Sequence, residues 1–279
     1  MLLTAGQPVA GSFSGLHRSL LKGSAMEFAE LRNYNPGDDL RRLDWKAYGR
    51  SDRYFLKEYE SETNARVYFL IDSSGSMLFE SSKGEKRLEY AKKVVATLAA
   101  LYLYQGDSVS IVHKKDGYLQ VPVYRGESCL SKVLLNLKEI EAGGGTSLGL
   151  DVKSLCERIP KRSIVFLLSD YLMDLGELYE GLQFLKSCAH EATLLQTLSE
   201  RELDISKEDH SAFRDLESDV VIKTHVKKVK QEYMERLSAH QNELAKCAVK
   251  QNAEYYLFQQ ESDIEDNLQD YIIQRLDQK

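Results

Sequence analysis

Residues 67–76 read Val-Tyr-Phe-Leu-Ile-Asp-Ser-Ser-Gly-Ser, and this stretch decides the fold. Its first five residues are all apolar, a pattern typical of a parallel strand that is covered by helices on both faces. A second apolar run, Ser-Ile-Val-Phe-Leu-Leu, follows at 163–168. Between the runs, apolar residues recur every three or four positions, which indicates helices. Strands that alternate with helices predict an α/β fold with a doubly wound, mostly parallel sheet.

The same patterns predict the remaining elements. We expect strands at 54–59, 108–112, 118–124, 191–198 and 254–259, with 118–124 as an antiparallel edge, and helices at 88–102, 130–140, 146–159, 175–188, 226–250 and 264–276. Pro36-Gly37-Asp38-Asp39 predicts a turn and a helix cap, and 218–225 a polar hairpin. We expect a flexible arm at 1–14, an Arg- and aromatic-rich extension at 15–62 that packs on the main domain, and an α/β domain at 63–279.

Three segments bring oxygen-bearing side chains to the carboxyl ends of the strands, where ligands bind in such a sheet. Asp72, Ser74 and Ser76 follow the strand at 67–71, Thr146 lies in the Gly-rich loop 143–147, and Asp170 follows the strand at 163–168. If both strands are parallel and central, the three segments meet at one edge. Two carboxylates and neutral hydroxyls form a hard oxygen set, which suits Mg²⁺ or Mn²⁺ rather than zinc or copper.

Each segment alone has a simpler interpretation. Asp-Ser-Ser-Gly-Ser is common in solvated turns, where Asp and Ser bond their own backbone. Thr146 after three glycines can cap a helix or belong to a phosphate cradle, and Asp170 can cap the end of a strand. The metal-site hypothesis depends on finding all three segments at strand ends or loops of one sheet. We interpret the neighbouring Ser73, Ser147 and Ser169 as structural.

The composition is that of a globular protein. The 279 residues carry 37 Lys and Arg against 43 Asp and Glu, a net charge of −6 that disfavours a dedicated nucleic-acid binder. No apolar run reaches the roughly 20 residues that span a bilayer, and the N-terminus lacks the basic and apolar regions of a signal peptide. The four cysteines stand apart, without the spacing of a zinc site. We therefore expect a cytoplasmic protein with reduced cysteines and no transmembrane segment.

Two motifs carry a resemblance to known families. Asp72-x-Ser74-x-Ser76, followed by Thr146 and Asp170, resembles the metal-ion-dependent adhesion site of von Willebrand factor A domains, and residues 67 to about 260 match the strand–helix order of that fold. A motif upstream is similar to the signature of the bacterial "domain of unknown function fifty-eight" family. It reads Glu27-Phe28-x-x-x-Arg32-x-Tyr34-x-Pro36-Gly37-Asp38-Asp39-x-Arg41-x-x-Asp44-Trp45 and continues through 50–60.

The resemblance implies a von Willebrand factor A-like (Rossmann-like) fold. It also implies a protein that works beside MoxR-type AAA+ ATPases in bacteria, in chaperone-like maturation or assembly of other proteins. By resemblance, Ser74, Ser76 and Thr146 would contact Mg²⁺ (or Mn²⁺ or Ca²⁺), and Asp72 and Asp170 would hold the ion directly or through water. An acidic residue of the ATPase or of a client protein would complete the metal's shell, so we expect a binding protein and not an enzyme.

Two other functions fit part of the sequence. Asp72 follows a buried strand as a nucleophilic Asp would, which suggests a metal-dependent phosphatase or hydrolase; the haloacid dehalogenase type, however, has a second Asp where this chain has Ser74. The Arg- and aromatic-rich segment resembles an RNA-binding surface in composition. Residues 11–66 nevertheless carry ten Lys and Arg against nine Asp and Glu. We therefore expect paired structural charges packed around Trp45, and no nucleic-acid partner.

Overall fold

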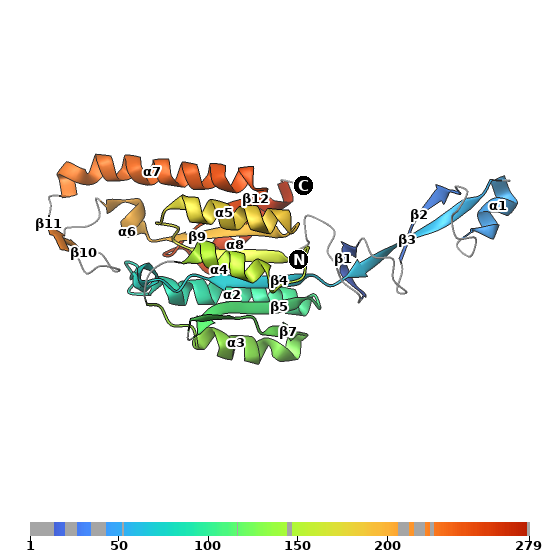
Figure 1. Cartoon of the computed structure of the whole chain (residues 1–279), viewed down its shortest axis with the longest axis horizontal. Helices are drawn as coiled ribbons and strands as arrows, with labels where there is room; N and C mark the ends of the chain where they lie inside the picture. The colour runs from blue at the N-terminus through green and yellow to red at the C-terminus, as the bar shows by residue number, and fades with distance from the viewer. Residues whose placement is uncertain are drawn as a thin grey trace.

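The computed structural model describes residues 14–19, 27–34, 43–51, 53–115, 117–143, 147–205, 212–214, 221–223 and 226–277. Its centre is a seven-stranded sheet in the order β12-β9-β8-β4-β5-β6, with β7 also paired to β5 (Figure 1). The strands are β4 (Arg66–Ile71), β5 (Ser108–Lys115), β6 (Tyr118–Gln120), β7 (Val123–Arg125), β8 (Ile164–Ser169), β9 (Glu191–Leu198) and β12 (Ala253–Gln259). The first five in the order pair parallel, and β6 and β7 pair antiparallel with β5. The mixed, mostly parallel sheet confirms the predicted fold class.

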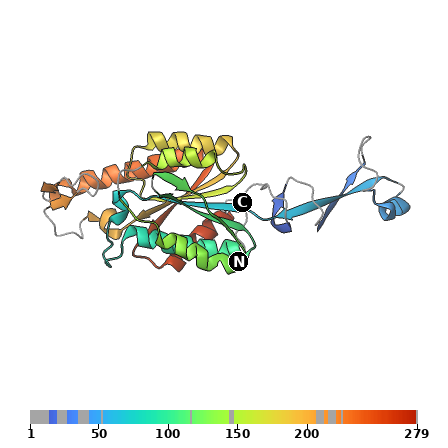
Figure 2. The same cartoon turned by 60° about the horizontal axis from the view of Figure 1, so that its bottom comes forward.

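Helices cover both faces of this sheet (Figure 2). One face carries α2 (Arg87–Tyr104), α3 (Leu130–Lys138) and α8 (Ile264–Asp277), and the other carries α4 (Leu148–Cys156), α5 (Leu175–Ser187) and α7 (Val226–Lys250). Successive side chains of a strand point to opposite faces. Phe69 of β4 therefore enters the core under α2, where it stacks on Phe166 at 5.0 Å, and Leu70 enters the core under α4 and α5. This double covering explains why the whole run at 67–71 is apolar.

The described residues before Asn64 form an N-terminal extension. Its antiparallel sheet has the order β1-β3-β2, from β1 (Ser14–Ser19), β2 (Glu27–Asn33) and β3 (Phe55–Thr63), and a short helix α1 (Trp45–Ser51) lies between β2 and β3 in the chain. The extension projects away from the main domain, with α1 at its far end (Figures 1 and 2). Its base is fastened by two hydrogen bonds of 2.7 Å, from Asn64 Nδ2 to the Gly106 carbonyl and from Ala65 N to Asp107 Oδ1.

This arrangement corrects two expectations. The described part of the 15–62 segment projects away from the main domain (Figure 1), and Trp45, which was expected inside a packed cluster of charges, is 66% exposed. Only two residues separate β3 from β4, so the sheet of the extension lies beyond the end of the central sheet. Helices already cover both faces of that sheet.

The other differences from the predicted elements have local causes. The strand expected at 118–124 is two strands, because Pro122 has no N–H to donate and interrupts the pairing. In place of a hairpin at 218–225, β10 (Ala212–Arg214) pairs with β11 (Val221–Lys223). The structure adds the helix α6 (Glu200–Leu203) and the 3₁₀ turns η2 (Gly75–Leu78) and η3 (Glu127–Cys129). The turn at Pro36–Asp39 and all but the last residue of 1–14 lie outside the described residues.

Within the described ranges, no helix combines the length and the apolar character that crossing a bilayer requires.

Candidate metal centre

The candidate site lies where β4 and β8 end, side by side in the sheet. Asp72 N donates to the Leu168 carbonyl at 2.8 Å, which ties the two strand ends together. The Asp72 carboxylate is buried and held from two sides: Oδ1 accepts from Ser74 N at 2.9 Å, and Oδ2 accepts from Ser169 Oγ at 2.6 Å. Asp72 and the segment after β8 therefore meet at one edge of the sheet, as the sequence predicted.

Two hydroxyls join Asp72 in the same loop. Ser74 precedes the turn η2, which brings Ser76 back beside it, and the two Oγ atoms lie 2.9 Å apart. Ser74 is buried, and Ser76 is partly exposed. The loop thus gathers a carboxylate and two hydroxyls within a few residues.

Asp170 directly follows β8 at this edge of the sheet and is 3% exposed. Its Oδ2 accepts from Arg87 Nη1 at 2.5 Å and its Oδ1 from Leu172 N at 3.1 Å, while Gln196 Nε2 donates to its carbonyl at 2.7 Å. Both carboxylate oxygens are therefore engaged, although each keeps a further lone pair. Because the Arg87 cation already compensates this carboxylate, a contact of Asp170 to an ion through water is favoured over a direct bond.

Arg87, the first residue of α2, was missed by the sequence analysis. Its guanidinium is fully buried and bonds Asp170, Glu202 of α6 and the Ser76 carbonyl, the last at 3.0 Å. It thus joins both halves of the site. Two signals were present: an arginine on the apolar stripe of α2, and the Ser-x-x-Glu capping box that holds Glu202.

The Gly-rich loop also reaches this edge. Gly143 N donates to the Ser73 carbonyl at 2.8 Å. Gly143 and Ser147 line a cavity of about 60 Å³ beside Asp72 and Ser74. Thr146 lies outside the described residues, and its neighbours in the chain Gly143 and Ser147 both line this cavity. On the rim, Lys114 forms an ion pair with Asp151 at 2.9 Å.

The electrostatics of Asp72 fit a bound cation. Burial raises the pKa of Asp72 above its ordinary value, the hydrogen bonds from Ser169 and Ser74 oppose this, and the nearby charge of Asp170 raises it further. Arg87 compensates the negative charges of Asp170 and Glu202. The described hydrogen bonds that Asp72 accepts come instead from uncharged groups, Ser74 N and Ser169 Oγ. A divalent ion held by Asp72, Ser74 and Ser76 would supply the missing positive charge with the oxygen ligands that Mg²⁺ takes.

Few of the candidate metal ligands are charged. Among the described residues, no group of three or more His, Cys, Asp or Glu side chains is placed to hold a metal. A site here would depend on hydroxyl oxygens and two carboxylates, and few charged ligands give low affinity. Metal binding by these residues stays a prediction.

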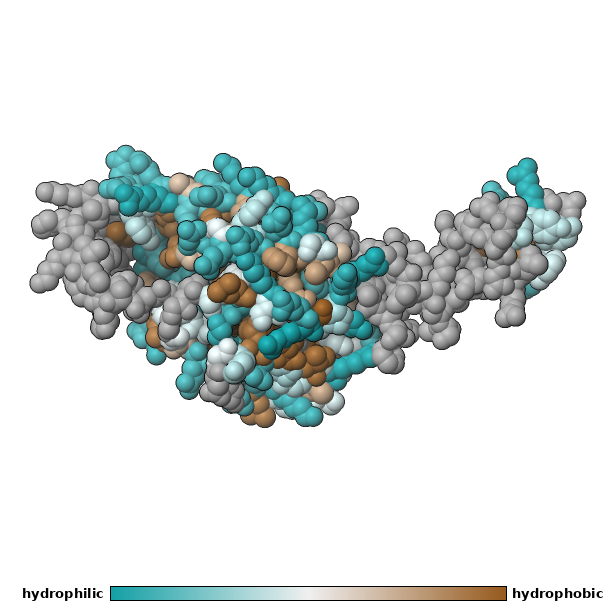
Figure 3. Space-filling model, in the orientation of Figure 1, coloured by the Kyte–Doolittle hydropathy of each residue, from teal (hydrophilic) through white to brown (hydrophobic). Residues whose placement is uncertain are grey.

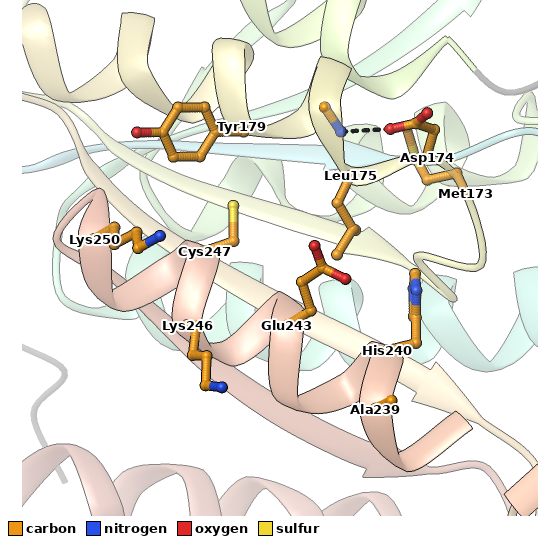
Figure 4. Close-up of a pocket in the computed structure, with 11 residues that line it drawn as sticks. Met173, Asp174, Leu175, Tyr179, Ala239, His240, Glu243, Lys246, Cys247 and Lys250 are labelled. Carbon is orange, nitrogen blue, oxygen red and sulfur yellow. Dashed lines mark hydrogen bonds between the residues drawn. The ribbon is translucent and has the colours of Figure 1, made fainter. Parts of the chain in front are cut away.

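A second cavity, of about 930 Å³, lies between α5 and α7 and contributes no residue to the candidate site (Figure 4). Its lining mixes charged and apolar side chains, including Glu243, Lys246 and Tyr179. One hydrogen bond links this cavity to the vicinity of the site: His240 Nε2 lies 2.6 Å from the carbonyl of Tyr171, the residue after Asp170. Asp174 Oδ1 accepts from Gly176 N at 2.7 Å and so caps α5.

Comparison with known proteins gives both sequence and fold relatives. A family model described as "Protein of unknown function DUF58" matches residues 30–243. The uncharacterized protein Rv1480 of Mycobacterium tuberculosis is 24% identical over 225 residues, which cover 78% of this chain and 69% of that protein. The crystal structure of an aerotolerance-related membrane protein from Bacteroides fragilis has 18% identity and a TM-score of 0.50, and covers 77% of this chain and 100% of that chain. The VWA domain of SpRpn10 has 11% identity and a TM-score of 0.42, and the match covers 74% of this chain and 94% of that chain. The chain shares the fold of the Bacteroides fragilis protein, and these comparisons assign it no activity.

Proposed function

This chain belongs to the DUF58 family, and from that premise we propose that it is a non-enzymatic, metal-dependent protein-binding module. In this proposal it acts with a MoxR-type AAA+ ATPase in chaperone-like maturation or assembly of other proteins. The observation that carries the proposal is the convergence of Asp72, Ser74 and Ser76 with Asp170 at one edge of the sheet. The family resemblance of the sequence supports the choice of partner.

In this proposal each residue has a distinct task. Asp72, Ser74 and Ser76 hold the ion, and Thr146 reaches it from the Gly-rich loop. Arg87 fixes the orientation of Asp170, which faces the ion through water. When bound, the ion offers an electrophilic position that a carboxylate of a partner can fill. Recognition of an acidic residue then depends on the metal.

The geometry favours binding over a phosphatase or hydrolase that uses Asp72 as a nucleophile. A nucleophilic carboxylate needs an oxygen free to attack. Both oxygens of Asp72 accept hydrogen bonds within the fold, from Ser74 N and Ser169 Oγ. These bonds draw charge from both oxygens and so lower their nucleophilicity, while each oxygen keeps a lone pair that can bind an ion.

The test is retention of the MoxR-type ATPase from the same genome on the immobilised full chain, in Mg²⁺ and in EDTA. We expect retention in Mg²⁺ and its loss in EDTA and in the variant Ser76→Ala. Ser131→Ala, at an exposed position of α3, is the matched control and should retain the ATPase. Equal retention in Mg²⁺ and EDTA would contradict the proposal. Metal-dependent hydrolysis of p-nitrophenyl phosphate that Asp72→Asn abolishes would support the phosphatase instead.

A further inference from the structure

The far end of the N-terminal extension carries a contiguous aromatic surface. Tyr48 and Tyr54 stack with ring centres 4.7 Å apart and planes at 12°, Tyr34 meets Tyr54 edge-on at 6.2 Å, and Trp45 meets Tyr48 at 6.3 Å. Trp45 is 66% exposed and Tyr54 is 49% exposed. We call these four residues the tip surface. It lies remote from the main domain (Figure 3), so it takes no part in the main core.

The tip surface is held in place by the backbone around it. Asp44 Oδ1 accepts from Lys46 N at 2.9 Å and from Ala47 N at 3.2 Å, which caps α1. Asp44 N donates to the Phe55 carbonyl at 2.8 Å, and Tyr34 N donates to the Tyr54 carbonyl at 3.0 Å. Leu43 and Leu56 pair across the strand and are buried. A surface fixed in this way loses little conformational entropy when a partner binds.

The charge around the tip surface differs from that of the chain. Among the side chains that the structure describes at 43–50 and 53–56, three basic residues are exposed and Asp44 is the one acidic residue, whereas the whole chain has a net charge of −6. These three residues are Lys46, Arg50 and Arg53, and each lies within two residues of one of the rings in the chain. Tryptophan, tyrosine and arginine are the residues that dominate binding energy at protein interfaces.

We propose that the tip surface is a docking site for an acidic segment of a partner protein. The exposed rings bury apolar side chains of that segment, and the three cations pair with its carboxylates. Charge complementarity steers the encounter, and burial of Trp45 supplies most of the affinity.

The ring geometry favours a protein over RNA. Bases bind by stacking on open aromatic faces. Tyr48 and Tyr54 already stack on each other, so each has one face covered before any ligand arrives.

The tip surface and the candidate metal centre lie at opposite ends of the molecule. The extension joins β4 at its first residue, Arg66, and the candidate metal centre follows the last, Ile71. The chain can therefore hold one partner at each end at the same time. The docking site does not depend on the metal, so it can be tested independently of the proposed function.

The first test maps the partner in the native host. Tyr54→p-benzoylphenylalanine places a photo-crosslinker in the tip surface of the full chain, and mass spectrometry locates the crosslinked segment. We expect an Asp- and Glu-rich protein segment, and we expect Lys46→Glu/Arg53→Glu to abolish its capture. The same crosslinker at Tyr104, which is 75% exposed on the main domain, is the matched control and should not capture it.

The second test titrates the captured segment, as a synthetic peptide, into the purified chain. Trp45 is the only tryptophan of the sequence, so its fluorescence reports contact at the tip surface. We expect a blue shift on binding, affinity at least about tenfold weaker in Lys46→Glu/Arg53→Glu, and equal affinity in Mg²⁺ and EDTA. Capture of RNA, of lipid, of a non-acidic segment or of nothing would overturn the proposal, as would unchanged affinity in the charge-reversal variant.

Discussion

Arg87 is a fully buried cation whose guanidinium lies between the carboxylates of Asp170 and Glu202. A buried ion pair adds little net stability compared with apolar residues, because removing both charges from water is costly. Removing only the cation is different, since it leaves two buried carboxylates uncompensated. Arg87 therefore serves mainly to fix Asp170 and Ser76 in the candidate metal centre.

We expect Arg87→Met to lower the free energy of unfolding by roughly 3–5 kcal/mol, because Asp170 and Glu202 lose their counter-charge. Urea unfolding of the purified chain measures this change. Arg236→Met is the matched control: Arg236 pairs with Glu232 on the surface of α7, and the cost there should stay below about 1 kcal/mol. A cost for Arg87→Met as small as that of the control would show that the buried pair does not stabilise the site.

His190 predicts a pH dependence of stability. Its Nδ1 accepts from Ser163 N at 3.2 Å, and burial lowers its pKa to about 4 from the ordinary value of 6.5. Between these pH values the unfolded chain binds the proton and the folded chain does not, so the free energy of unfolding falls as the pH falls. The contribution is fully present above pH 6.5, and its loss is complete near pH 4.

We expect the wild type to lose about 2 kcal/mol more than His190→Asn between pH 7 and pH 5. Asparagine can keep an acceptor for Ser163 N but does not titrate, so the comparison cancels the contribution of the carboxylates. Urea unfolding at both pH values measures the difference. The same loss in both proteins would rule out the lowered pKa.

At the scale of elements, α4 and α5 approach each other at two glycines. An added Cβ on Gly149 would lie 2.5 Å from the Glu177 carbonyl oxygen, and one on Gly181 would lie 3.0 Å from the Gly149 carbonyl oxygen. The distance at Gly149 is too short for a side chain, and the distance at Gly181 is tighter than an ordinary Cβ contact. The close approach holds α4, which follows the Gly-rich loop, in position over the sheet.

We expect Gly149→Ala to destabilise the fold by about 1–3 kcal/mol, because the helices must move apart. Gly49→Ala in α1 is the control, since a Cβ there would meet no atom within 4 Å. Thermal unfolding of both variants against the wild type makes the comparison. If the two substitutions have equal effects, the helices are not packed through Gly149.

Elements with a strong local pattern could be predicted from the sequence. The runs at 67–71 and 163–168 became β4 and β8, because burial on both faces requires continuous apolar residues. Arg87 could not be assigned a partner, since Asp170 and Glu202 lie 83 and 115 residues away in the chain. No local pattern predicts whether Trp45 is buried or exposed. Its exposure depends on how β3 leads into β4, because that junction places the extension beyond the end of the central sheet.

At the scale of the whole molecule, the sheet separates two surfaces of different chemistry. The carboxyl ends of β4 and β8 carry acidic and hydroxyl side chains, and the extension beyond the start of β4 carries aromatic and basic ones. This polarity follows from one strand, since the extension enters β4 at one end and Asp72 leaves it at the other. A protein built in this way suits the bridging of two partners.

The most direct measurement is calorimetric titration of Mg²⁺, with Mn²⁺ as a second ion, into the full chain and its variants. We predict one ion bound per wild-type and per Ser131→Ala chain. Asp72→Asn and Ser74→Ala should weaken the affinity at least about tenfold, because each removes an oxygen ligand. A wild-type chain that binds no ion, or variants that bind as tightly as the wild type, would contradict the metal site on which the proposed function depends.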